Sequence, residues 1–169
     1  MNASAELLLP RADWAHHPRF PHQTLLLGGH AGFRRTSRSL VDSSSAGRSP
    51  RGLLWVFRTW KAAMHSHERY EETKLYPYLE ARWGLSMEPA RSGHDVLARC
   101  ERDVLAAAAA GGDRFEATLR AHDEVLCAHL DLEEQLVIPA LLALEPEEFD
   151  DYIHSDIRGL LQRLEARTA

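Results

Sequence analysis

Two stretches of the chain, HERYEETKLYPYL at residues 67–79 and HLDLEEQLVIPAL at residues 129–141, repeat one pattern. Each begins with His, carries two consecutive Glu one helical turn later, and ends with two apolar residues, Pro, any residue and Leu. The offset between matching positions is 62 residues throughout. Because the register is constant, the repeat indicates two equivalent helical units rather than a similarity of composition.

The spacing of His and Glu within each stretch points to metal binding. His67 and Glu71, like His129 and Glu133, are four residues apart, which places them on one helix face about 6 Å apart along the axis. Both pairs fall on the apolar stripe of their helix, so the spacing predicts buried side chains rather than ordinary surface His–Glu pairs. A buried Glu without a cation would cost several kcal/mol, on the order of the penalty for any unpaired charge.

Apolar periodicity extends the helical prediction over most of the chain. We expect a helix from Pro21 to the linker SSSAGRSP at 43–50, and others over about 51–82, 88–110, 113–140 and 146–167. Pro77 predicts a kink or an early stop in the second of these, and β-branched alternation typical of strands is absent. The sequence therefore predicts an all-α antiparallel helical bundle that forms a single domain over residues 1–169, with its core at about 20–145 and an accessory helix at 146–167.

Two further histidines complete a candidate ligand set. His30 and His94 lie on the inward stripes of the first and third predicted helices, so each of four helices contributes one imidazole. Neutral imidazole suits iron or zinc, and a carboxylate can bridge two ions. Four nitrogens and two carboxylates are few for two six-coordinate ions, which would leave a position open to an external ligand.

The order His, His-x-x-x-Glu, His, His-x-x-x-Glu, together with the shared Pro-containing tails, resembles the hemerythrin-like (HHE cation-binding) domains. The resemblance covers about residues 20–145 and implies an up-down-up-down antiparallel four-helix bundle around a non-haem di-iron centre. It also implies the metal ligands, with Glu71 and Glu133 as the carboxylate bridges between two iron ions, and oxygen or nitric oxide as the small ligand. Carried over by position, the ligands are His30, His67, Glu71, His94, His129 and Glu133.

Two departures from the oxygen-carrying hemerythrins narrow the expected function. Those proteins have a second His four residues after the one on the third helix, where this chain has Ala98. They also end with an Asp five residues after the last His, whereas the carboxylate here is Glu133 at plus four. The resemblance therefore favours the sensor-like or repair-like members of the family over those that carry oxygen reversibly.

Other functions remain open at this point. One alternative is a di-iron enzyme, either a peroxidase, an oxidase or a repair protein for iron centres; another is a bundle with a structural metal such as zinc. Four further residues are weaker ligand candidates: His22, Glu68, His122, which we expect in the core or behind the metal ligands, and Glu101, which we expect at the surface.

Composition excludes some classes of protein. The net charge of −5, from 25 acidic and 20 basic residues, argues against a nucleic-acid binder. No run of about 18 apolar residues is present, so we expect no membrane partner. Only two cysteines occur, Cys100 and Cys127, and the start lacks the features of a signal peptide, so we expect a cytoplasmic protein. The apolar stripe of the C-terminal helix predicts either a cap on the bundle or a homodimer contact.

Overall fold

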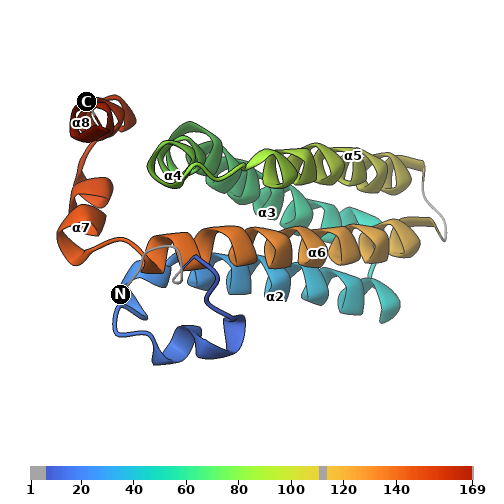
Figure 1. Cartoon of the computed structure of the whole chain (residues 1–169). Helices are drawn as coiled ribbons and strands as arrows, with labels where there is room; N and C mark the ends of the chain where they lie inside the picture. The colour runs from blue at the N-terminus through green and yellow to red at the C-terminus, as the bar shows by residue number, and fades with distance from the viewer. Residues whose placement is uncertain (1–6, 111–113, 169) are drawn as a thin grey trace. The chain divides into compact units, whose positions relative to one another are not determined.

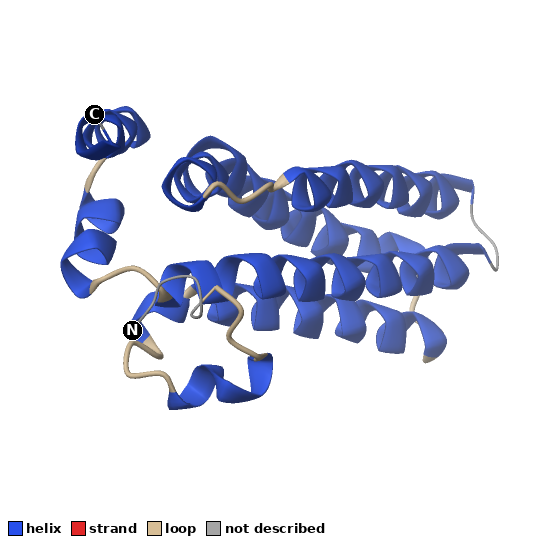
Figure 2. Cartoon of the chain, in the orientation of Figure 1, coloured by secondary structure: helices blue, strands red, loops and turns tan. Residues whose placement is uncertain are grey.

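The computed structural model describes residues 7–110 and 114–168 and is helical throughout its regular elements (Figure 1). Figure 2 shows helices and loops and no strand in these two ranges, which confirms the all-α prediction for them. The elements are the 3₁₀ turns Arg11–His16 and His22–Thr24, α2 (Leu26–Ser45), α3 (Pro50–Tyr70), the π-helical turn Glu71–Leu75, α4 (Tyr76–Trp83), α5 (Glu88–Ala110), α6 (Arg114–Leu142), α7 (Pro146–His154) and α8 (Ile157–Thr168).

Most predicted helices lie where the periodicity placed them. Helix α5 has the bounds that the apolar pattern predicts, 88–110. Gly111 and Gly112, which the sequence favours as the end of this helix, and Asp113, a good N-cap for the next, lie outside the described residues. No helix of the described ranges is both long enough and apolar enough to cross a membrane.

The single C-terminal helix predicted over 146–167 is wrong, because the structure has two helices there. Helix α7 ends at His154, and Ser155 adopts extended backbone with φ −102° and ψ 155°. Asp156 then accepts a hydrogen bond from the Gly159 backbone N–H at 2.9 Å, as a residue at a helix N-terminus does. A local capping group therefore starts a new helix inside a continuous apolar stripe.

The predicted disturbance at Pro77 takes the form of a π-helical turn. Proline has no backbone N–H, so it cannot close an α-helical hydrogen bond to Thr73. The Tyr76 N–H instead reaches the carbonyl of Glu71, five residues back, while Thr73 Oγ1 donates to the Arg69 carbonyl at 2.6 Å. The other copy of the repeat keeps Pro139 inside the uninterrupted helix α6, so the two copies share a sequence pattern but differ in backbone.

The described chain divides into two compact units. Unit 2 comprises Gly28–Glu68 and Glu88–Asp131, and unit 1 comprises the described residues of Met1–Leu27, Arg69–Met87 and Leu132–Ala169. Helices α3 and α6 each run from one unit into the other.

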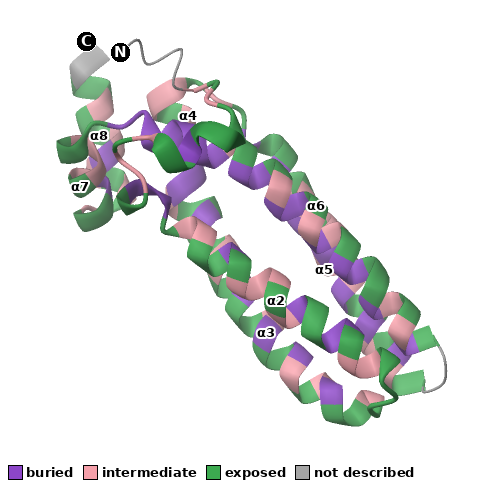
Figure 3. Cartoon of the chain, turned by 90° about the horizontal axis from the view of Figure 1, so that it is seen from below, coloured by how far each residue is buried: buried purple, intermediate pink, exposed green. Residues whose placement is uncertain are grey.

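Unit 2 is built around one apolar core to which segments of α2, α3, α5 and α6 all contribute. Buried positions recur along each of these helices at helical intervals (Figure 3). The core comprises Leu40, Val41, Leu53, Phe57, Trp60, Met64, Leu97, Val104, Ala107, Phe115, Leu119, Leu126 and Leu130. Burial of each large apolar side chain contributes about 1.5–3 kcal/mol, so this core orients the helix faces that carry the histidines.

In unit 1, the N-terminal arm satisfies the carbonyl groups near the end of α6. Arg19 Nη1 donates to the Leu142 carbonyl at 2.8 Å, and Gln23 Nε2 donates to the Leu144 carbonyl at 3.1 Å. The last carbonyls of a helix have no partner within the helix. Trp14 packs with Ile138 and Leu142 in a small core of its own, so residues 7–24 of the N-terminal arm pack as part of unit 1.

Also in unit 1, α7 places a tyrosine against the segment that precedes and includes α4. Tyr152 is 2% exposed, stacks on Tyr78 with ring centroids 4.9 Å apart, and shares a hydrogen bond with the Tyr70 hydroxyl. Tyr78 in turn donates to Glu148 of α7 at 3.3 Å. Leu160 of α8, which belongs to the C-terminal apolar stripe, is also 2% exposed, so part of that stripe is covered within the chain.

Candidate metal centre

The two His-x-x-x-Glu motifs have the helical geometry that their spacing predicts. His129 and Glu133 lie one turn apart on α6, with exposed fractions of 4% and 0%. His67 lies in the last turn of α3, and Glu71 is the first residue of the π-helical turn and fully buried. Each motif therefore presents an imidazole and a carboxylate on neighbouring turns.

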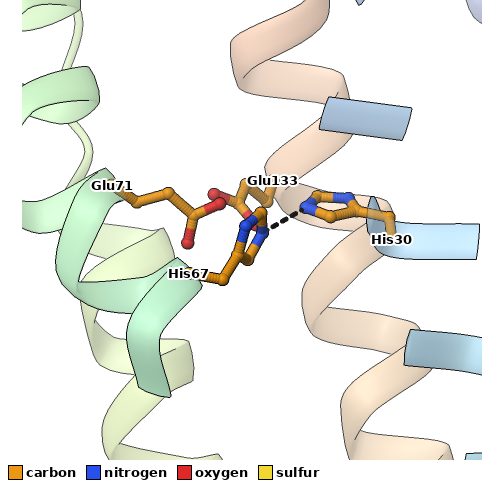
Figure 4. A group of neighbouring side chains, drawn as sticks. All are labelled: His30, His67, Glu71 and Glu133. Atoms are coloured by element: carbon orange, nitrogen blue, oxygen red, sulfur yellow. Dashed lines mark hydrogen bonds between the residues drawn. The ribbon is translucent and has the colours of Figure 1, made fainter. Parts of the chain in front are cut away.

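Four of the six predicted ligands form one compact group, shown in Figure 4. One donor atom from each of His30, His67, Glu71 and Glu133 lies within 4.8 Å of the other three. His30 Nε2 and His67 Nε2 are 3.0 Å apart, and the two carboxylates point toward these imidazoles. Three of the four side chains are buried and His67 is half-buried. The group combines residues 30, 67, 71 and 133, which are far apart in the sequence.

The donor set of this group fits a divalent metal ion. Imidazole nitrogen and carboxylate oxygen are ligands of iron, zinc and manganese. Two carboxylates within one buried group repel each other unless positive charge lies near them. A bound cation would remove that repulsion and use all four donors at once.

The two remaining predicted ligands form a second contact. The rings of His94 on α5 and His129 on α6 have centroids 4.8 Å apart and an interplanar angle of 65°. Both side chains are buried, at 6% and 4% exposed. They are not members of the four-residue group, but His129 lies one helical turn from Glu133, which is. The predicted residues thus form one group of four and one pair.

Tyr76 is a further member of the site, and the sequence alone did not show that its side chain lies there. Its hydroxyl donates to Glu133 Oε1 at 2.5 Å, and the side chain is fully buried. Burial raises the pKa of Tyr76 far above its usual value, and the charges of Glu133 and Glu71 raise the pKa further. The phenol therefore stays protonated and donates to the Glu133 carboxylate. The matching residue in the other copy of the repeat is Ile138, so the repeat offered no signal for this contact.

The weaker ligand candidates lie elsewhere. His22 is exposed, and neither it nor the half-buried Glu68 belongs to the four-residue group. His122 is 1% exposed, and its ring contacts those of Phe57 and Trp60 with centroid distances of 5.3 and 4.9 Å. The expectation that His122 lies in the core is therefore correct.

The expectation that Glu101 is a surface residue is wrong. Glu101 is 1% exposed, and its Oε2 accepts from Lys61 Nζ and from His65 Nε2, both at 2.9 Å. Both donors come from α3, so a cationic side chain on a neighbouring helix compensates the buried charge. The spacing within α5 alone could not indicate this partner.

One comparison with known proteins identifies the family of this chain. No curated protein and no solved structure matches the chain. The family model of the Hemerythrin HHE cation binding domain matches residues 22–141, a range that contains all six predicted ligands. The chain therefore belongs to the hemerythrin HHE cation-binding domain family.

Proposed function

We propose that this protein binds a carboxylate-bridged pair of iron ions and binds or senses oxygen or nitric oxide at an open position of that centre. The observation that carries the proposal is the group of His30, His67, Glu71 and Glu133, whose donor atoms lie within 4.8 Å of one another. Membership of a cation-binding family supports metal binding in general. The up-down-up-down antiparallel four-helix bundle is part of the same proposal.

In this proposal, the chain supplies two kinds of ligand. The imidazoles of His30, His67, His94 and His129 and the carboxylates of Glu71 and Glu133 would hold the two ions. Six protein ligands leave coordination positions for an external molecule. Iron, when bound, supplies the electrons and the open position that a diatomic ligand requires.

Tyr76 orients the Glu133 carboxylate, and the burial of the centre limits the access of water and of an external ligand. The Tyr76 hydrogen bond to Glu133 Oε1 holds that carboxylate in one orientation, as groups behind metal ligands commonly do. Three of the four donors in the group are buried and His67 is half-buried, so bulk water is largely excluded from the centre. We expect an incoming ligand to approach at the His67 side.

The structural-zinc alternative has less support. Structural zinc sites usually hold four closed ligands, often including Cys. Both cysteines, Cys100 and Cys127, are free and half-buried, and neither belongs to the group of candidate ligands. A donor set of imidazoles and carboxylates favours a reactive ion over a closed structural one.

Anaerobic loading of the purified protein with Fe(II) tests the proposal. We expect about two iron ions per chain by metal analysis, the number that a carboxylate-bridged pair requires. Addition of nitric oxide should give an iron-nitrosyl signal by electron paramagnetic resonance, and addition of oxygen should give an oxo-to-iron absorption band. His129→Ala should lower the iron content, whereas His154→Ala, which changes an exposed residue of α7, should not.

Other results would reject the proposal in distinct ways. Iron bound without any spectral response to oxygen or nitric oxide would reject the ligand-binding function. One tightly bound zinc ion per chain, with no iron after expression in iron-rich medium, would favour the structural role. Repeated consumption of peroxide, lost in His129→Ala, would favour the enzymatic alternative. The cytoplasmic location and the homodimer stay predictions.

A further inference from the structure

A glycine precedes each of the two predicted ligands that lie outside the His-x-x-x-Glu motifs. The pairs are Gly29–His30 on α2 and Gly93–His94 on α5. Positive φ among the described glycines occurs only at Gly47 and Gly84, so neither Gly29 nor Gly93 is required by an unusual backbone conformation. Glycine is the poorest helix former apart from proline, and both positions lie within helices. We therefore asked whether neighbouring atoms leave room for a side chain at these two positions.

Both glycines face an imidazole of a His-x-x-x-Glu motif. A Cβ built at Gly29 would lie 3.9 Å from His67 Cε1, which is an ordinary contact. A Cβ built at Gly93 would lie 2.2 Å from His129 Nδ1, 3.0 Å from its Cε1 and 3.2 Å from its Cγ. Carbon atoms that pack well are about 3.5–4.0 Å apart, so the His129 ring occupies the space that a side chain at position 93 would need.

Positions 29 and 93 therefore differ in whether they can accommodate a side chain larger than that of glycine. At position 29 a methyl group fits without movement, and at Gly32 in the same helix nothing lies within 4 Å of an added Cβ. At position 93 the obstacle is the body of a ring rather than the end of a flexible chain. His129 is 4% exposed and its ring also contacts His94. Neighbouring atoms therefore leave the His129 ring little space to move away from a Cβ at position 93.

We propose that Gly93 is a positioning residue of the metal centre, whose missing side chain lets the His129 imidazole lie against α5 beside His94. Any larger residue at position 93 displaces this ring and moves a ligand nitrogen. The steric part of the inference stands on the contact alone, and its consequence for metal binding rests on the proposed function.

The steric part is tested on metal-free protein. Gly→Ala within a helix normally stabilises a protein, so Gly32→Ala and Gly29→Ala should leave the melting temperature unchanged or raise it. Gly93→Ala should lower it, after chelator treatment of all samples. An equal or raised melting temperature for Gly93→Ala would overturn the proposal.

A double-mutant cycle assigns the effect to His129. In a His129→Ala background the obstacle is gone, so Gly93→Ala should no longer lower the melting temperature of the metal-free protein. If Gly93→Ala alone fails to fold, this experiment still tests the proposal, because the double variant His129→Ala/Gly93→Ala should then fold. A penalty of the same size in both backgrounds would show that the ring is not the obstacle and would overturn the proposal.

Metal binding separates this inference from the proposed function. Where the wild type and Gly32→Ala load with iron, Gly93→Ala should bind it ~10- to 100-fold more weakly, the loss typical when groups that orient ligands are disturbed. Unchanged iron affinity for Gly93→Ala would overturn the positioning role. If the wild type itself binds no iron, the proposed function fails while the stability contrast between positions 93 and 32 still tests the contact.

Discussion

The phenol of Tyr76 and the carboxylate of Glu133 are joined by a hydrogen bond of 2.5 Å in the fully buried part of the protein. The two residues come from different copies of the repeat, with Tyr76 on α4 and Glu133 on α6. The direction of the bond is set by the raised pKa of Tyr76, which keeps the proton on the phenol. One copy of the motif thus orients the proposed bridging ligand of the other.

Removal of this hydroxyl should weaken metal binding. We expect Tyr76→Phe to lower iron affinity by ~10- to 100-fold, because groups that orient a ligand contribute about that much. Competition with a chelator of known affinity measures the change. Tyr78→Phe is the matched control, since Tyr78 is also buried but donates to Glu148 rather than to a candidate ligand. Equal iron affinities for the two variants would contradict the role of Tyr76.

Lys61 should matter for stability because it compensates a buried charge. Lys61→Met leaves Glu101 with His65 as its remaining donor, and we expect a loss of ~1–3 kcal/mol, discounted because Lys61 is itself partly exposed. Chemical denaturation at neutral pH measures the free energy of unfolding. Arg120→Met is the control, since it breaks the exposed pair with Glu116 and should cause no measurable change. A Lys61 variant as stable as wild type would contradict the importance of this pair.

His122 should make the protein less stable in acid. Burial lowers the pKa of His122 to about 4, while the charges of Glu101 and Asp123 act in the opposite direction. In the unfolded state, His122 has an ordinary pKa near 6.5, so the unfolded chain takes up the proton at a higher pH than the folded protein. The contribution of His122 to the free energy of unfolding is therefore fully present above about pH 6.5 and decreases as the pH falls toward 4. The shift corresponds to ~3 kcal/mol at most. Denaturant unfolding of metal-free protein across this range should show a shallower pH dependence for His122→Leu than for wild type; parallel curves would reject the prediction.

The N-terminal arm should contribute to the stability of unit 1 through Trp14. This side chain is 4% exposed and packs with Ile138 and Leu142, so Trp14→Ala should cost ~3–5 kcal/mol, as large deletions in a core do. Trp55→Ala removes the same side chain from a position that is 72% exposed and should change the free energy of unfolding by less than ~0.5 kcal/mol. Thermal or chemical denaturation compares the two, and similar losses would show that the arm is not packed as described.

Spacing along the chain predicted helices α2, α3, α5 and α6 and most of their buried positions. The four members of the candidate group are among the six residues that the sequence predicted as ligands. His67 and Glu71, or His129 and Glu133, share a face because the helical period is a local property of the backbone. The apolar stripes then indicate which face is buried. Residues such as His30 could be added because they lie on the stripe of their own helix.

Contacts between helices were not predictable in this way. Glu101 was expected at the surface, but it is buried and accepts hydrogen bonds from the partly exposed Lys61 and His65 of α3. The Tyr76–Glu133 hydrogen bond and the contact of His129 with Gly93 likewise join residues that are far apart in the sequence. Each depends on the rotation and separation of two packed helices. Periodicity within one helix carries no information about those two quantities, because they arise from the packing of all side chains in the core.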